Sequence, residues 1–332
     1  MSQAGIAMDT GSVRGRVMRA KIASLIQRQG ALIALLLVSV FATIRYENFL
    51  TVENLTNILR QQSMIGLVAL GMTFVILTAG IDLSVGSLVA VAAVTSATLA
   101  DQGLIVALLA GVALSTALGL INGLVIAKAR IQPFIVTLAM MMAARGFALA
   151  YTNEKSVSVP PLARSFRELG RGKIDLSAFP LYYPVLILVI AYVLGWVVLK
   201  YTRFGRHVYS LGDNEEAARL MGLNVGRVTI GVYTLSGALA GLAGVLLASR
   251  LGAGQPVAGV SWELDAIAAV VVGGTLLTGG QGGAISTLIG VLLLGVILNI
   301  LTQENISPWW QLLFRGIILL VVVVVQRVLS KR

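Results

Sequence analysis

The sequence predicts an all-α membrane protein, and three observations support this fold class. Of the 332 residues, 57% are hydrophobic and only 12% are charged, and the mean hydropathy is +0.91. Soluble domains carry about 25% charged residues, so this low content is typical of a chain that lies in a bilayer. Long apolar runs recur along the chain. The net charge of +11 can orient such a chain and contact anionic lipid, so it does not indicate a nucleic-acid partner.

About ten membrane spans are expected, because a helix needs roughly 20 mostly apolar residues to cross a bilayer. The first span follows a run of basic residues, which should hold the tail of residues 1–28 in the cytoplasm. No convincing small-x-small cleavage site follows, so we expect a retained anchor rather than a removed signal peptide. Residues 29–332 then form one transmembrane domain. The expected spans are about 29–45, 62–79, 83–100, 104–126, 131–151, 180–199, 226–249, 262–278, 284–302 and 308–327.

Basic residues set the orientation of these spans. Segments on the side of the N-terminus carry more Lys and Arg than segments on the opposite side, so both termini and the loop 200–227 are expected in the cytoplasm. The loop 152–179 is the exception, since it carries several basic residues and yet is expected outside. Longer loops can cross a membrane despite such charge, so the expected topology stands.

Spans 2–5 and spans 7–10 share a residue pattern that indicates an internal repeat. In each half, an Asn near the end of one span is followed by a Pro and by an Arg-Gly pair inside the next span. Span 2 would run inward and span 7 outward, so the halves would be inverted copies, as in many transporters. Chance similarity between Gly- and Val-rich helices is the alternative. The paired residues are Asn122, Pro133 and Arg145 in the first half, and Asn299, Pro308 and Arg315 in the second.

Several charged residues lie inside or beside apolar runs. A charge near the bilayer centre costs roughly 2.5–3.5 kcal/mol, so it normally has a partner or a function. Asp82 lies between two apolar runs, and Glu263 and Asp265 lie at the start of a span. These acids either line a polar path at helix breaks or cap helix N-termini, and capping is the favoured interpretation of Asp265. For Arg145 and Arg315, pairing within the chain is favoured over contact with a solute.

Glycines and amides complete the set of candidate path residues. The segment 273–283 holds more glycine than helix packing requires, which indicates a flexible turn at a gate. The pairs Gly119/Gly123 and Gly237/Gly241 instead favour close helix packing. The candidate path or gate residues are Gly80, Asp82, Gly86, Asn122, Glu263, Asp265, Gly279, Gly280 and Asn299.

The longest stretch of mixed charge is the loop 200–227, and its middle predicts one short helix. Asp213 or Asn214 can cap the N-terminus, and two acidic residues follow where the helix dipole favours them. Gly222 can end the helix in a left-handed conformation. A capped helix with an exposed Leu-Met end is a candidate docking element for a partner protein, and a solvated loop helix is the alternative. The candidate docking residues are Asn214, Glu215, Glu216, Ala217, Ala218, Arg219, Leu220, Met221 and Gly222.

Missing residue types and motifs exclude several functions. The chain has no Cys and one His, so disulfides, thiol nucleophiles and thiolate or His-based metal sites are unavailable. No G-x-x-x-x-G-K-[ST] motif occurs, so we expect no ATP site and no other cofactor in this chain. The sequence lacks voltage-sensor Arg spacing and a TVGYG-like filter, which disfavours a channel. No catalytic residue is expected.

Five long strings occur along the chain in an order typical of a known family. They are VALGMTFVILTAGIDLSVGSLVA (68–90), ARIQPFIVTLAMMMAARG (129–146), TRFGRHVYSLGDNEEAARLMGLNV (202–225), ELDAIAAVVVGGTLLTGGQG (263–282) and SPWWQLLFRGIILL (307–320). On these strings, the chain from about residue 30 onward resembles the ribose-type permeases of bacterial ATP-binding-cassette sugar importers. This resemblance implies a permease of the bacterial inner membrane that moves a monosaccharide, often a pentose. It also implies a second permease chain, ATPase subunits that dock near 202–225 and hold the ATP, and a periplasmic sugar-binding protein.

Two other functions remain open from the sequence. A secondary transporter driven by an ion gradient would need no ATPase, but transmembrane acid pairs are lacking and the loop 202–225 is present. A permease for another small polar solute, such as a branched-chain amino acid, would keep the architecture and change the cargo. Only the residues of the five strings quoted above argue against this second alternative.

Overall fold

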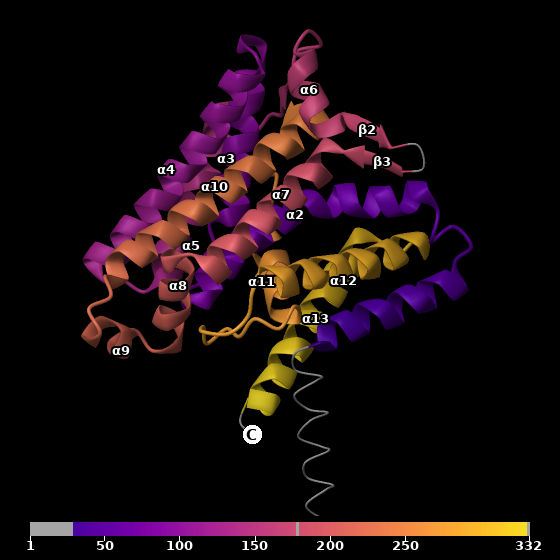
Figure 1. Ribbon diagram of the computed structural model, residues 1–332. Coiled ribbons are helices and arrows are strands. Elements are labelled where there is room, and N and C mark those ends of the chain that lie inside the picture. Colours follow the sequence, from indigo (N-terminus) through magenta and orange to yellow (C-terminus); the bar gives the residue numbers. More distant parts are fainter. Residues whose placement is uncertain (1–28, 177–178, 331–332) are drawn as a thin grey trace, which may run out of the picture.

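The computed structural model describes residues 29–176 and 179–330, and these residues are almost entirely helical (Figure 1). The tail 1–28, expected in the cytoplasm, lies outside the described residues. The helices are an N-terminal helix described over Gln29–Arg45, α2 (Val52–Leu77), α3 (Val85–Thr98), η1 (Ala100–Gln102), α4 (Leu104–Ala129), α5 (Pro133–Thr152), α6 (Arg164–Arg171), α7 (Tyr183–Tyr201), α8 (Arg203–Asp213), α9 (Glu215–Leu220), α10 (Val225–Leu251), α11 (Trp262–Val272), α12 (Ala284–Gln303) and α13 (Pro308–Ser330).

Four short strands form two antiparallel pairs in the described part of the chain. One pair joins β1 (Val157–Ser158) to β4 (Ala253–Gly254), and the other joins β2 (Lys173–Leu176) to β3 (Phe179–Tyr182). Figure 1 shows α6 at the top, with the hairpin of β2 and β3 beside it. The expected span at 180–199 therefore begins slightly too early, because its first residues belong to β3.

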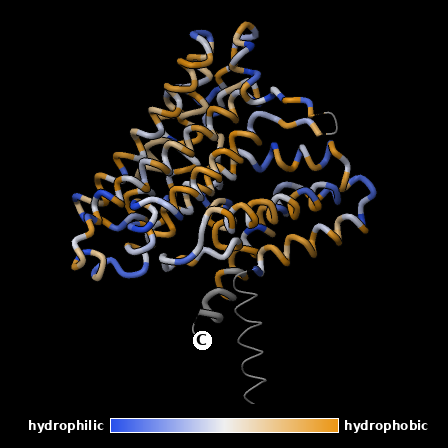
Figure 2. The backbone as a smooth tube through the Cα atoms, in the orientation of Figure 1, coloured by the Kyte–Doolittle hydropathy of each residue, from blue (hydrophilic) through white to orange (hydrophobic). Residues whose placement is uncertain are grey.

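Six helices among the described residues are long and apolar enough to cross a membrane: α2, α4, α5, α7, α10 and α12. Among the described residues, shorter apolar helical stretches cover Gln29–Arg45, Val85–Thr98 and Pro308–Val321. Figure 2 shows hydrophobic residues along the long helices and hydrophilic residues around α8 and α9. The all-α membrane class is confirmed at this level.

Two expected spans, 83–100 and 262–278, are shorter helices than predicted. α3 has 14 residues and α11 has 11 residues. At 1.5 Å per residue they are about 21 Å and about 16 Å long, against a hydrocarbon core of about 30 Å. Both follow a non-helical segment, which we name the α2–α3 break (78–84) and the α10–α11 break (252–261). Irregular backbone of this kind is tolerated at membrane depth only where protein covers it, and α3 is buried almost all round.

α2 and α10 form the centre of the molecule. α10 packs on α4 at very short range, since a Cβ atom placed on Gly119 would lie 2.9 Å from the Cα atom of Gly237. A Cβ on Gly241 would lie 3.0 Å from the Cα atom of Val112. The packing interpretation of these small-residue pairs is confirmed. Only glycine lets two helix backbones approach so closely.

The two halves of the chain share one order of elements. In α2–α5, a long helix is followed by a break, a short helix, another long helix and a helix that begins at Pro133. In α10–α13, the same sequence ends in a helix that begins at Pro308. The order of elements is thus shared by the two halves, and their relation as an inverted repeat stays a prediction.

Candidate functional site

The α2–α3 break is held by hydrogen bonds to Asp82, which is fully buried. Its Oδ1 atom accepts from the N–H (3.0 Å) and the Oγ (2.6 Å) of Ser84, which precedes α3. Its Oδ2 atom accepts from Ser236 Oγ on α10 at 2.9 Å. Asn122 on α4 donates to Ser84 Oγ at 3.0 Å. The predicted break is confirmed, and Asp82 and Asn122 are brought together as part of the link between α3, α4 and α10.

The first turns of α3 and α11 touch each other. A Cβ atom on Gly86 would lie 2.2 Å from the carbonyl oxygen of Gly259 and 2.5 Å from Glu263 Oε2. A Cβ on Gly80 would lie 2.6 Å from the hydroxyl oxygen of Tyr233. Gly80 and Gly86 are thus positions without space for a side chain. Glu263 lies at the contact between the two short helices.

Two arginines hold the segment that begins α11. Arg145 on α5 donates through Nη1 to the carbonyls of Pro256 (2.6 Å) and Ala258 (2.8 Å) in the α10–α11 break. Arg315 on α13 forms an ion pair with Asp265 in the first turn of α11, with Nη1 2.7 Å from Oδ2. The prediction that both arginines have partners within the chain is confirmed. The capping interpretation of Asp265 is wrong, because the N-cap of α11 is Ser261 and the carboxylate of Asp265 binds Arg315 instead.

Asn299 and the glycines of 273–283 lie apart from this contact. Asn299 on α12 donates to Asn54 Oδ1 on α2 at 2.8 Å. Gly279 and Gly280 have positive φ angles of 86° and 73°, which explains the need for glycine there. The N–H of Gly280 donates to the carbonyl of Leu77, the last residue of α2, at 3.0 Å. The glycine-rich segment is therefore attached to the end of α2, and its role as a gate stays a prediction.

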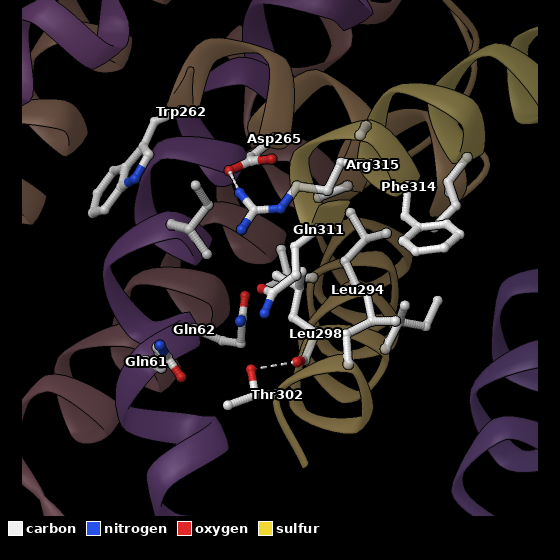
Figure 3. Close-up of a pocket in the computed structure, with 17 residues that line it drawn as sticks. Gln61, Gln62, Trp262, Asp265, Leu294, Leu298, Thr302, Gln311, Phe314 and Arg315 are labelled. Atoms are coloured by element: carbon white, nitrogen blue, oxygen red, sulfur yellow. Dashed lines mark hydrogen bonds and ion pairs between the residues drawn. The ribbon is translucent and has the colours of Figure 1, made fainter. Parts of the chain in front are cut away.

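A cavity of about 200 Å³ lies between α2, α11, α12 and α13 (Figure 3). Its polar lining consists of two carboxamides of α2, one of α13, the Asp265–Arg315 ion pair and Thr302. Sequence reasoning found only Asp265 among its candidate path residues. The sequence feature that indicates the other polar lining residues is the pair of adjacent amides, Gln61 and Gln62, within an apolar helix. The apolar lining includes Trp262, Leu294, Leu298 and Phe314.

The chemistry of this cavity suits an uncharged polar solute. The carboxamides of Gln61 and Gln62 offer both donors and acceptors, which match hydroxyl groups, whereas Gln311 already donates through Nε2 to the carbonyl of Ile306 at 2.8 Å. The charges of Asp265 and Arg315 neutralise each other. An aromatic face is available from Trp262. A zwitterion would need free charges of both signs, and here the two charges bind each other.

The helix predicted within the loop 200–227 is present as α9. Asn214 is its N-cap, and its Oδ1 accepts from the N–H of Ala217 at 2.9 Å. Gly222 has a φ of 82° and follows the helix in the left-handed conformation. The exposed fractions of Leu220 and Met221 are 86% and 75%, so the apolar end is free of contacts that would bury it within the described chain. The local structure is confirmed, and docking stays a prediction.

The same loop contains a second helix, α8, which sequence reasoning missed. Thr202 caps α8 by accepting from the N–H of Gly205 at 3.1 Å, so the signal was present in the sequence. A Cβ on Gly212 would lie 1.8 Å from the carbonyl oxygen of Leu77 in α2. Tyr209 donates its hydroxyl to the carbonyl of Gly282 at 2.8 Å, and burial raises the pKa of Tyr209. α8 therefore joins α9 to both α2 and the segment 273–283.

A cavity with polar groups among long apolar helices, two broken helices and an exposed capped helix are typical of a membrane transport protein. The chain belongs to the family of the branched-chain amino acid transport system / permease component, whose sequence model matches residues 54–323. It is accordingly a multi-pass protein of the inner membrane.

Curated relatives match most of the chain. The Ribose import permease protein RbsC of Escherichia coli (strain K12) is 42% identical over 322 residues, covering 96% of this chain and 98% of that protein. The L-arabinose ABC transporter permease protein AraH of Azospirillum brasilense is 37% identical, covering 92% and 89%. The Xylose transport system permease protein XylH of Haemophilus influenzae is 33% identical, covering 88% and 94%. No solved structure matches significantly.

Proposed function

We propose that this chain is the permease subunit of an ATP-driven importer that carries a monosaccharide into the cell. The observation that carries this proposal is the similarity, over nearly the whole chain, to permeases named for ribose, arabinose and xylose. Ribose or a related pentose is the first candidate, since the permease named for ribose is 42% identical. The neutral, hydroxyl-matching cavity between α2, α11, α12 and α13 supports the same cargo class.

In this proposal the chain performs no chemistry of its own. ATP is bound and hydrolysed by a separate cytoplasmic ATPase, which docks on α9 through Leu220 and Met221. A second copy of the permease completes the membrane unit, and a periplasmic sugar-binding protein delivers the cargo. Residues 29–332 form the transmembrane domain with about ten crossings, residues 1–28 a cytoplasmic tail, and both termini face the cytoplasm. The halves α2–α5 and α10–α13 are related as an inverted repeat.

The contacts of α8 indicate how binding of the ATPase to α9 acts on the cavity. Besides packing on α7 and α10, α8 contacts the C-terminal end of α2 and the segment 273–283 that follows α11. Both α2 and α11 line the cavity. A displacement of α9 and α8 by the ATPase therefore acts on two of the four cavity walls. ATP binding then favours one of two membrane conformations through differential binding free energy.

Reconstituted transport tests this function. The permease is placed in vesicles with its ATPase and binding protein, and uptake of labelled ribose, xylose, arabinose and leucine is measured with and without ATP. We expect ATP-dependent uptake of one or more sugars. Gln62→Leu, which replaces a cavity amide by an apolar side chain, should reduce uptake, whereas Leu109→Met on the exposed face of α4 should not. Uptake driven by an ion gradient without ATP would contradict the proposal.

A branched-chain amino acid is the second candidate cargo, because the family description names one. The paired charges of Asp265 and Arg315 disfavour it. ATP-dependent uptake of leucine without uptake of sugar in the same vesicles would replace the first candidate by the second.

A further inference from the structure

A second cavity, of about 450 Å³, lies where α7 ends, α8 passes and α12 begins. Two basic side chains line it, Lys200 and Arg206. In the described part of the chain, neither forms an ion pair with an acidic residue. Instead the Nζ atom of Lys200 lies 5.0 Å from the ring centre of Trp196 and 5.3 Å from that of Tyr201. The cavity therefore carries two positive charges without neutralisation from the described residues.

The backbone adds to this positive potential. The 20-residue helix α12 begins at the same cavity, which its first residues Ala284, Ile285 and Ser286 line. Its N-cap residue is Gly283, which forms no side-chain cap. The free N–H groups and the dipole of a helix N-terminus favour an anion. The cations and this terminus point to the same type of ligand.

The surroundings of the cavity decide which anion fits. α7 and α12 are both long and apolar enough to cross a membrane, and the cavity lies at their ends. Beside it, Ile285 and Val197 have exposed fractions of 54% and 36%, and Tyr201 has 59%. Aromatic and basic side chains at the end of a membrane helix lie at headgroup level. The occupant must therefore combine a negative group with apolar chains.

We propose that this cavity binds the headgroup phosphate of an anionic phospholipid, with the acyl chains along α7 and α12. Basic pockets between membrane helices are suited to such headgroups. The site is separate from the polar cavity, and it borders α8 through Tyr209. A lipid bound here would hold α8 against the start of α12 and so stabilise the elements next to the docking helix.

Native mass spectrometry of the full-length protein tests this site. The protein is titrated with phosphatidylglycerol or with the zwitterionic phosphatidylethanolamine, and we expect tighter binding of phosphatidylglycerol. In Lys200→Gln/Arg206→Gln the affinity for phosphatidylglycerol should fall about 25-fold, because each of the two cations that line the cavity contributes roughly fivefold to binding of an anionic headgroup. The matched control Lys128→Gln/Arg130→Gln removes the same charge at the exposed end of α4 and should leave the affinity unchanged.

A third variant separates binding from folding. Gly283→Asp places a carboxylate at the N-cap of α12, where the backbone is extended (φ 170°) and accepts any residue. An Asp at this position stabilises the helix but repels a phosphate. We expect an unchanged or higher unfolding temperature together with loss of phosphatidylglycerol binding.

Several results would overturn the proposal. Unchanged phosphatidylglycerol affinity in Lys200→Gln/Arg206→Gln would place the lipid elsewhere, and an equal loss in the α4 control would mean non-specific attraction. Inorganic phosphate that competes as well as the lipid would assign the cavity to a free anion. If Lys200→Gln/Arg206→Gln no longer copurified with the ATPase but still bound the lipid, Lys200 and Arg206 would be contacts for the ATPase rather than for a lipid.

Discussion

At the scale of single residues, Asp82 has the clearest structural role. Its carboxylate accepts three hydrogen bonds from Ser84 and Ser236, and so joins the start of α3 to α10. Asp82→Leu would leave these donors without an acceptor, and each unsatisfied buried group costs about 1–3 kcal/mol. We expect Asp82→Leu to lower the free energy of unfolding by about 2–4 kcal/mol and to reduce transport.

Asp82→Asn is the matched control, because its amide oxygen keeps part of the acceptor capacity. It should be milder than Asp82→Leu in both thermal unfolding and transport. Equal, near-normal behaviour of the two variants would mean that the hydrogen bonds around the α2–α3 break are dispensable.

The Asp265–Arg315 ion pair allows a second prediction at this scale. The side chains are 18% and 32% exposed, so the pair is largely withdrawn from solvent. Removing one partner of a buried pair costs up to about 3–5 kcal/mol, whereas removing both costs much less. We expect Arg315→Met to destabilise the protein more than the double variant Asp265→Leu/Arg315→Met. Chemical unfolding of the wild type, Asp265→Leu, Arg315→Met and the double variant as a double-mutant cycle measures the coupling, and additive effects would contradict it.

At the scale of elements, α9 is a short helix whose apolar end is unused by the described chain. Because Leu220 is 86% exposed, Leu220→Asp should leave stability unchanged. Burying one such side chain at a docking interface contributes roughly 1.5–3 kcal/mol, or about one to two decades of affinity. We expect Leu220→Asp to abolish copurification of the ATPase and sugar uptake.

Glu216→Ala is the control for α9, since exposed charge pairs contribute only about 0–1 kcal/mol. It should retain most ATPase binding. An ATPase that stays bound and is stimulated by sugar in Leu220→Asp would show that α9 is a solvated connection.

The contact of α8 with α2 is the second prediction about elements. A methyl group on Gly212 would lie 1.8 Å from the carbonyl oxygen of Leu77, so Gly212→Ala must separate the two helices. We expect normal ATPase copurification but a large loss of sugar-stimulated ATP hydrolysis and uptake. Gly226→Ala on α10 is the control, because its nearest neighbour would be 3.6 Å away. Normal uptake in Gly212→Ala would exclude this contact from the coupling path.

At the scale of the whole molecule, the absence of cysteine makes the topology directly measurable. Single cysteines can replace Arg206 in α8 and Ser165 in α6, two helices that lie toward opposite ends of the molecule in Figure 1. In intact cells, an impermeant thiol reagent should label Ser165→Cys and spare Arg206→Cys, because the loop 200–227 is proposed to be cytoplasmic. After cell lysis both should react, and the reverse pattern in intact cells would overturn the topology.

Local sequence signals determined many features of this protein. The low charge and the long apolar runs determined the all-α membrane class, because run length decides whether a helix can cross a bilayer. Asn214 and Gly222 determined α9, since caps act within one helical turn. Asp82 also marked the α2–α3 break in the sequence, although it does not cap α3, because the N-cap residue is Ser84.

Only the tertiary structure decided which apolar runs become short helices and which polar residues meet. α3 and α11 are too short for a full span, and the non-helical segments before them are tolerated because other helices cover them. The sequence near α3 and α11 does not indicate which helices will cover these segments. The cavity joins Gln61 of α2 to Gln311 of α13, residues distant in the chain. Spacing along a sequence reports neighbours within one helix, whereas a cavity is made by side chains from different helices. The sequence therefore identified the helices, and their packing created the candidate site.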